Sequence, residues 1–162
     1  MIDAYLKSEV ESDDAAMHLL FSANRWEKRK QLKETLESGT TIVADRYAFS
    51  GVAFSAGKGL PHLTPEWCRA PDQGLPAPDA VFFMQLSPEA AATRGGYGQE
   101  RYEDPLLQAS VKRQFESLRD ASWHVVDAAR DIPSIQADVQ RLADDALRRA
   151  DGGEGLQELW RA

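Results

Sequence analysis

The sequence contains a single cysteine, Cys68, which excludes an internal disulfide and a cysteine-based metal cluster. Its three histidines, His18, His62 and His124, have no ligand-like spacing, so we expect no zinc site held by the protein. No apolar run approaches the ~20 residues of a membrane-spanning helix, and the acidic start MIDAYLKSEVESDD has no signal-peptide core. We therefore expect no membrane partner, and the lone thiol suits a reducing compartment.

Blocks of Lys and Arg are also missing, and 26 acidic residues outweigh 19 basic ones, for a net charge of −7. A nucleic-acid binder usually presents a basic face, so we expect no nucleic-acid partner. Hydrophobic residues make up 43% and charged residues 28% of the chain, which is typical of a globular protein. With 162 residues and no repeat or linker, the sequence predicts one domain over residues 1–162.

Three short apolar runs rich in Val, Ile and Phe predict strands at Thr41–Ala44, Ala80–Leu86 and Trp123–Val126. Their apolarity is continuous rather than alternating, which favours a parallel sheet covered on both faces. Helices are predicted between them, at residues 14–36, from Ser87 onward, and at Leu106–Arg119 and Ile132–Arg149. The alternation indicates an α/β domain with three layers.

The first predicted helix repeats apolar residues with helical spacing, which suggests a core stripe; its members are Ala16, Leu19, Leu20, Ala23 and Trp26. Phe21 and Arg25 are four residues apart and so share a different face. An aromatic ring beside a guanidinium can hold a flat base and donate to its carbonyl edge. Taken alone, the pair fits a core Phe and a solvated Arg better.

Two further segments each fit either a functional or a purely structural role. Asp45 and Arg46 follow a predicted strand, where α/β proteins bind ligands, but such a pair is as often a turn with a local ion pair. The run RGGYGQERYE at residues 94–103 has three glycines and fits either a hinged lid or a helix-terminating loop.

The runs HLLFSANRWE and DRYAFSGVAF resemble two signatures of eukaryotic-type thymidylate kinases, and they are in register. The segments Trp67-Cys68, PDQGLPAPDAVFFMQL, RGGYGQERYE and LQELW also resemble that family, in the family's order. The resemblance implies a P-loop-kinase-like three-layer fold and transfer of the ATP γ-phosphoryl group to dTMP, giving dTDP for dTTP synthesis. It also implies Mg²⁺ as cofactor, a homodimer and a location in the cytoplasm, with the nucleus as a second location.

By the same resemblance, Phe21 stacks on the thymine, Arg25 bonds its carbonyl edge and Arg46 holds the 5′-phosphate. The remaining roles implied are the sugar wall at Gly51 and Phe54, closure of the pocket by Tyr102, a magnesium-bound water on Asp45, adenine stacking by Arg94 in a lid at about 94–104, and adenine contacts from Ala129 and Arg130. Asp45, Arg46 and Arg94 are thus the implied catalytic residues.

The phosphate loop G-x-x-x-x-G-K-[ST] of this family does not occur in the sequence, since Gly57-Lys58-Gly59 fails the pattern at residues 52 and 59. We expect the first strand, that loop and the second strand to precede Met1 in a longer protein, through a truncated gene model or an alternative start rather than an evolved loss. The fold is then incomplete, with no catalysis by these 162 residues. The alternative is a non-catalytic nucleotide-binding or dimerisation protein that retains the dTMP pocket.

The sheet of such an incomplete fold has a vacant place. We expect parallel pairing of Ala80–Leu86 with Trp123–Val126, and no ladder between Thr41–Ala44 and Ala80–Leu86. Paired strands lie ~4.8 Å apart, so a vacancy predicts about twice that separation.

Overall fold

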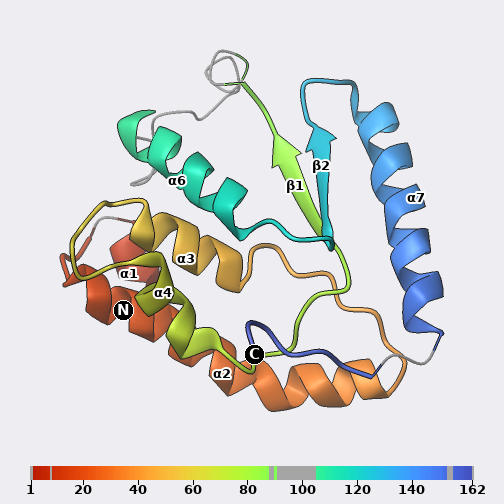
Figure 1. Ribbon diagram of the computed structural model, residues 1–162, viewed down its shortest axis with the longest axis horizontal. Helices are drawn as coiled ribbons and strands as arrows, with labels where there is room; N and C mark the ends of the chain where they lie inside the picture. Colours follow the sequence, from red (N-terminus) through yellow and green to blue (C-terminus); the bar gives the residue numbers. More distant parts are fainter. Residues whose placement is uncertain (1, 8, 88–89, 91–104, 153–154, 162) are drawn as a thin grey trace. The chain divides into compact units, whose positions relative to one another are not determined.

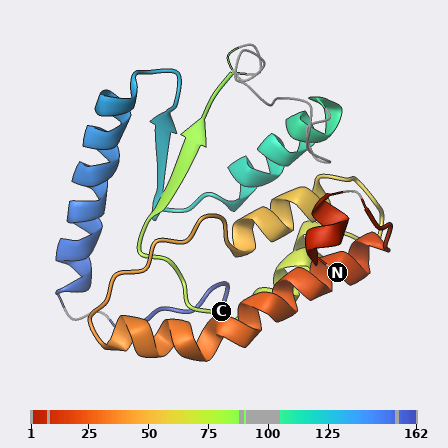
Figure 2. The ribbon, with the colours of Figure 1, turned by 180° about the vertical axis from the view of Figure 1, so that it is seen from behind.

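The computed structural model describes residues 2–7, 9–87, 90, 105–152 and 155–161 (Figures 1 and 2). Its residues cluster into two compact units, one formed by segments 1–76, 98–118 and 158–162 and the other by segments 77–97 and 119–157. Each unit is described by itself below. The expectation of one domain over residues 1–162 stays a prediction.

The first unit is helical. Its elements are α1 (Ile2–Leu6), α2 (Asp14–Glu37), α3 (Ala48–Ala56), α4 (Pro65–Arg69), the 3-10 turn η1 (Ala70–Asp72) and α6 (Pro105–Leu118). The core is centred on α3, whose sequence AFSGVAFSA is apolar nearly all round and which packs against α2, α4 and α6. A helix of this composition is stable only when it is covered on several sides, as it is here.

The long helix α2 confirms the helix predicted at residues 14–36 (Figure 1). Asp13 caps its start, where the carboxylate accepts hydrogen bonds from the Ala15 and Ala16 N–H groups at 2.9 and 3.0 Å. At the other end, Gly39 adopts a φ of +81°, which a glycine accommodates without steric cost. Both ends of the helix are therefore specified by local sequence.

The predicted core stripe of α2 is wrong. Leu19 and Trp26 are 46% and 39% exposed, whereas the buried residues of the helix are Met17, His18 and Ser22. The reason is that His18 and Ser22 find polar partners in α3, α4 and η1, so the polar side of the helix is the side that packs.

The Gly57-Lys58-Gly59 run ends α3, and its lysine is held in place rather than left in solvent. Lys58 forms an ion pair with Asp14 at the start of α2, and its ammonium donates to the Tyr5 hydroxyl at 3.2 Å. Tyr5 is fully buried, so this cluster ties α1 to the ends of α2 and α3.

The second unit contains the parallel strands β1 (Val81–Gln85) and β2 (Trp123–Asp127), with α7 (Ile132–Ala150) packed on β2 (Figure 1). The register runs from Val81 opposite Trp123 to Gln85 opposite Asp127. The predicted parallel pairing of these two strands is confirmed, and so are the helices predicted at Leu106–Arg119 and Ile132–Arg149.

No strand forms at Thr41–Ala44, so that prediction is wrong. The predicted absence of a ladder with Ala80–Leu86 stays a prediction. Val43 is 93% exposed. A strand exists only through its hydrogen-bonded neighbour, and the sole sheet among the described residues consists of β1 and β2. The predicted spacing of a vacant place in the sheet stays a prediction.

The C-terminal residues join the first unit next to η1. The Leu159 N–H donates to the Leu75 carbonyl at 2.8 Å, and the Gly74 N–H donates to the Leu159 carbonyl at 3.0 Å. Trp160 meets Phe49 edge to face, with ring centroids 5.6 Å apart. The tail thus fixes the loop that follows Asp72.

At the predicted helix start, the Ala90 N–H donates to the Ser87 hydroxyl at 3.2 Å, and Ala90 is helical. The predicted lid at about 94–104 lies almost wholly outside the described residues. Within the described ranges, no helix is both long and apolar enough to cross a membrane.

Candidate nucleotide-binding site

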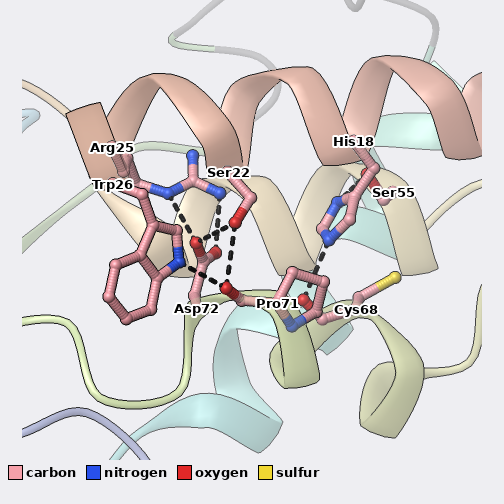
Figure 3. A network of polar contacts seen from close by, with 8 residues as sticks. All are labelled: His18, Ser22, Arg25, Trp26, Ser55, Cys68, Pro71 and Asp72. Carbon is pink, nitrogen blue, oxygen red and sulfur yellow. Dashed lines mark hydrogen bonds and ion pairs between the residues drawn. The ribbon is translucent and has the colours of Figure 1, made fainter.

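Arg25 on α2 forms a two-pronged ion pair with Asp72 of η1 (Figure 3). Its Nε donates to Asp72 Oδ1 at 3.0 Å and its Nη2 to Oδ2 at 2.6 Å. The Asp72 side chain is completely buried, and that of Arg25 is 13% exposed. Parallel N–H···O bonds of this kind fix the plane of the guanidinium as well as its position. Arg25 is therefore held rigidly, not solvated as a surface residue.

Two neighbours of Arg25 complete this attachment of α2 to η1 (Figure 3). The Ser22 hydroxyl donates to Asp72 Oδ1 at 2.7 Å, and the Trp26 indole N–H donates to the Pro71 carbonyl at 2.6 Å. The buried carboxylate of Asp72 therefore accepts three hydrogen bonds in all, which offset the cost of removing it from water.

His18 makes the next connection, one helical turn before Ser22 (Figure 3). Its Nε2 lies 2.9 Å from the Cys68 carbonyl oxygen and its Nδ1 lies 2.8 Å from the Ser55 hydroxyl. A carbonyl only accepts, so Nε2 carries the proton and Nδ1 accepts from Ser55. Burial lowers the pKa of His18, which keeps this neutral tautomer in place.

Helix α3 presents Gly51 and Phe54, three residues apart, on one face. A methyl group added at Gly51 would lie 3.0 Å from Arg25 Nη2, so a larger residue there would force the guanidinium to shift. Arg46, just before the helix, places its guanidinium carbon 5.5 Å from the centre of the Phe54 ring. The structure thus brings Arg25 to Gly51 and Arg46 to Phe54, as neighbours on the same helix face.

Arg46 differs from Arg25 in having no acidic partner among the described residues and in its backbone conformation. It is exposed, has no ion pair with any described acidic residue, and adopts a φ of +63°, which is rare for a residue with a side chain. Strained backbone of this type concentrates at ligand sites, although the strain does not itself identify one.

Phe21 is half-buried on α2, one turn before Arg25, as the spacing predicts. Tyr47 was not among the predicted residues. Its hydroxyl is buried with no hydrogen-bond partner among the described residues, and burial, aided by the charge of Asp72, raises its pKa to about 12. Asp72 was not singled out from the sequence either, because its contacts are with residues of α2 that lie far away in sequence.

Asp45 is exposed, as a contact to a magnesium-bound water would need. Among the described residues no group of three His, Cys, Asp or Glu side chains could hold a metal ion. A single carboxylate fits an outer-sphere contact to magnesium carried by a nucleotide, and it does not fit a metal cage built by the protein.

In the second unit, Ala129 and Arg130 follow β2. Asp127 accepts a hydrogen bond from the Ala129 N–H at 2.9 Å, so this N–H is already bonded within the loop. Arg130 pairs with Asp138 of α7 at 2.6 Å, and this bond raises the pKa of Arg130. Arg130 and Asp138 line an open groove of about 570 Å³ between β2 and α7. Arg94 and Tyr102 lie outside the described residues, so their predicted roles stay predictions.

The fold defines the class of this protein as an α/β protein with a parallel sheet, consistent with a P-loop-kinase-like fold. It is similar to the solved structure of thymidylate kinase from Candida albicans, with a TM-score of 0.83 and 31% identity, over 97% of this chain and 78% of that one.

The sequence model of the thymidylate kinase family matches residues 1–139. Thymidylate kinase from Arabidopsis thaliana is 46% identical over 99% of this chain and 60% of its own length. The human thymidylate kinase is 44% identical over 99% of this chain and 76% of its own length. The chain belongs to the thymidylate kinase family, and it spans 60–76% of the length of these relatives.

Proposed function

We propose that this chain binds dTMP and that it is the monophosphate-binding part of an enzyme that transfers the ATP γ-phosphoryl group to dTMP. The observation that carries the proposal is that two arginines, Arg25 of α2 and Arg46 just before α3, lie against the same face of α3. Arg25 is neutralised by Asp72, whereas Arg46 is exposed and unpaired among the described residues. A nucleotide has a neutral base at one end and an anionic phosphate at the other, which matches these two charge states.

In the proposed complex the thymine stacks on Phe21 and accepts a hydrogen bond from Arg25. The 5′-phosphate lies at Arg46, whose planar guanidinium can donate to two phosphate oxygens. Phe54 is in contact with the Arg46 guanidinium and, with Gly51, forms the wall along the sugar. Tyr102 closes the pocket in this proposal.

ATP is the proposed co-substrate, with Arg94 on its adenine and with Ala129 and Arg130 beside it. Magnesium bound to the ATP phosphates would neutralise charge during the transfer, and Asp45 would hold one of its waters. We further propose cytoplasmic and nuclear locations by analogy with the family.

The binding proposal is tested by calorimetric titration with dTMP and with thymidine, which lacks the phosphate. The Arg46→Ala variant should bind dTMP at least about tenfold more weakly, the equivalent of 1.4 kcal/mol, and should bind thymidine as the unmodified chain does. Equal losses for both ligands would show that Arg46 does not hold the phosphate.

We propose that phosphorylation of dTMP needs a phosphate loop, and no such loop occurs in these 162 residues. Loss of one preorganised donor commonly costs ~10²–10³ in rate, and this loop supplies several. A coupled ADP-release assay should therefore detect no dTMP phosphorylation by this chain, whereas a longer chain with a G-x-x-x-x-G-K-[ST] segment should be active. Equal rates for the two chains would refute this part of the proposal.

A second role, dimerisation, is favoured by the exposed apolar residues of α2. Leu19, Leu20 and Trp26 are 46%, 36% and 39% exposed, and Leu19, Ala23 and Trp26 recur with helical spacing. We propose that this stripe packs against a second copy of the chain. Analytical ultracentrifugation should show a dimer that Leu19→Glu dissociates. A monomer at every concentration would refute the proposal.

A further inference from the structure

We infer that Asp72 is a positioning residue for nucleobase selection. It fixes the Arg25 guanidinium and cancels its charge, so that the free edge of Arg25 donates to an uncharged carbonyl oxygen. The inference rests on the proposed function, because it assigns the base-recognising group of that site a partner. Asp72 need not touch the nucleotide to have this effect.

Geometry supports the positioning role first. Asp72 takes the edge of the guanidinium formed by Nε and Nη2, at 3.0 and 2.6 Å. The hydroxyl of Ser22 holds the carboxylate from the side at 2.7 Å. Nη1 then points its hydrogens away from Asp72, and the described residues offer it no hydrogen-bond acceptor. A guanidinium fixed on one edge presents donors in a single direction on the other.

The other side of the guanidinium is restricted too. A methyl group added at Gly51 would lie 3.0 Å from Arg25 Nη2 and 3.4 Å from Nη1, so the backbone of α3 runs directly beside the group. Arg25 is therefore confined between η1 and α3, and its orientation is set before a ligand arrives. Preorganised donors of this kind bind without a further cost in side-chain entropy.

Charge supplies the second half of the inference. Asp72 is completely buried and carries one negative charge against the one positive charge of Arg25, so the pair is neutral in sum. A neutral pair does not compete with Arg46 for the phosphate, which directs the anionic end of the nucleotide to Arg46. Since a guanidinium donates only, Arg25 also disfavours an amino group at the position of the pyrimidine 4-carbonyl.

The competing explanation is that Asp72 only attaches η1 to α2. Loss of Asp72 would then lower the stability of the chain and weaken the binding of every nucleotide in the same proportion. The two explanations differ in base selectivity, which a purely structural attachment leaves unchanged.

The experiment compares dTMP with 5-methyl-dCMP by calorimetric titration of the 162-residue chain. The two ligands share the ring methyl group, sugar and phosphate, and differ in carrying a carbonyl or an amino group at position 4. The unmodified chain should bind dTMP more tightly than 5-methyl-dCMP, and the ratio of the two dissociation constants is the preference. Asp72→Asn should lower this preference at least about tenfold, because the guanidinium that binds the base is then no longer fixed. An unchanged preference in Asp72→Asn would overturn the inference.

Ser22→Ala keeps both charges and removes one hydrogen bond to the carboxylate, so it should lower the preference in the same direction and by less. It also serves as the test where Asp72→Asn does not fold. In an Arg25→Ala background, Asp72→Asn should change the preference no further, and an additional loss there would also overturn the inference.

The two levels of the account fail differently. If the unmodified chain binds neither nucleotide, the proposed function is wrong and the inference falls with it. If it binds both nucleotides equally, dTMP binding stands and the inference about base selection is wrong. If the unmodified chain prefers dTMP and both Asp72→Asn and Ser22→Ala keep that preference, only the role of Asp72 is wrong.

Discussion

Gly51→Ala should weaken dTMP binding and should cost the chain only a modest part of its stability. The added methyl group would lie 3.0 Å from Arg25 Nη2, which is itself 2.6 Å from Asp72. The guanidinium is pinned from both sides and must shift by a few tenths of an ångström. Losing one hydrogen bond to a charged group costs about 1.5–3 kcal/mol, whereas replacing a helical glycine by alanine returns about 1 kcal/mol.

The expected net destabilisation is thus about 0.5–2 kcal/mol, measured as the free energy of unfolding in urea. The affinity for dTMP should fall about tenfold, because a displacement of about 1 Å costs up to ~10²-fold and the shift expected here is smaller. Calorimetric titration measures this second quantity directly.

Gly57→Ala, at the end of the same helix, is the matched control. There a methyl group would meet the Ala53 carbonyl oxygen at 2.6 Å and Val111 Cγ2 at 2.9 Å, and neither arginine is among the atoms it would approach most closely. It should cost about 1–3 kcal/mol of stability through overpacking, while the folded chain keeps its affinity for dTMP. If Gly51→Ala binds dTMP as tightly as the unmodified chain, the guanidinium is not pinned and the reasoning is refuted.

Three further predictions concern the first unit. Lys58→Met removes the ion-pair partner of the partly buried Asp14 and should destabilise the chain by about 1–3 kcal/mol in urea unfolding. The double variant Lys58→Met/Asp14→Asn should recover part of this stability, and no recovery would contradict the stabilising role of the ion pair. The lowered pKa of His18 favours its neutral form. The contribution of His18 to stability is therefore present above pH ~6.5 and is lost as the pH falls through the lowered pKa of the folded chain. The urea midpoint should fall more steeply between pH 7.5 and 5.5 than it does in His18→Gln, and equal slopes would contradict this. Burial raises the pKa of Cys68 to about 11, so iodoacetamide at pH 8 should label the thiol only after unfolding; rapid labelling of the folded chain would show that α4 opens.

Local sequence patterns predicted the elements whose cause is local. The capping residues Asp13 and Gly39 fix the ends of α2, and the apolar runs of β1 and β2 locate the paired strands. Thr41–Ala44 has the composition of a strand, but composition cannot supply the hydrogen-bonded neighbour that makes a strand.

The site was predicted only in part for the same reason. Phe21 and Arg25 could be placed on one helix face from their spacing, and Arg46 and Phe54 from a signature. Asp72 was not predicted, because it lies 47 positions from Arg25 and meets it only after η1 packs on α2. The helix face with fewer apolar residues turned out to be the packed one, since buried polar partners there outweigh the apolar stripe.

A crystal structure of this chain with dTMP tests the central claim most directly. The account predicts the phosphate within hydrogen-bonding distance of Arg46, the 4-carbonyl oxygen of thymine on Nη1 of Arg25, and the Arg25–Asp72 pair intact. A phosphate bound at Arg25, or a nucleotide bound away from α2 and α3, would contradict it.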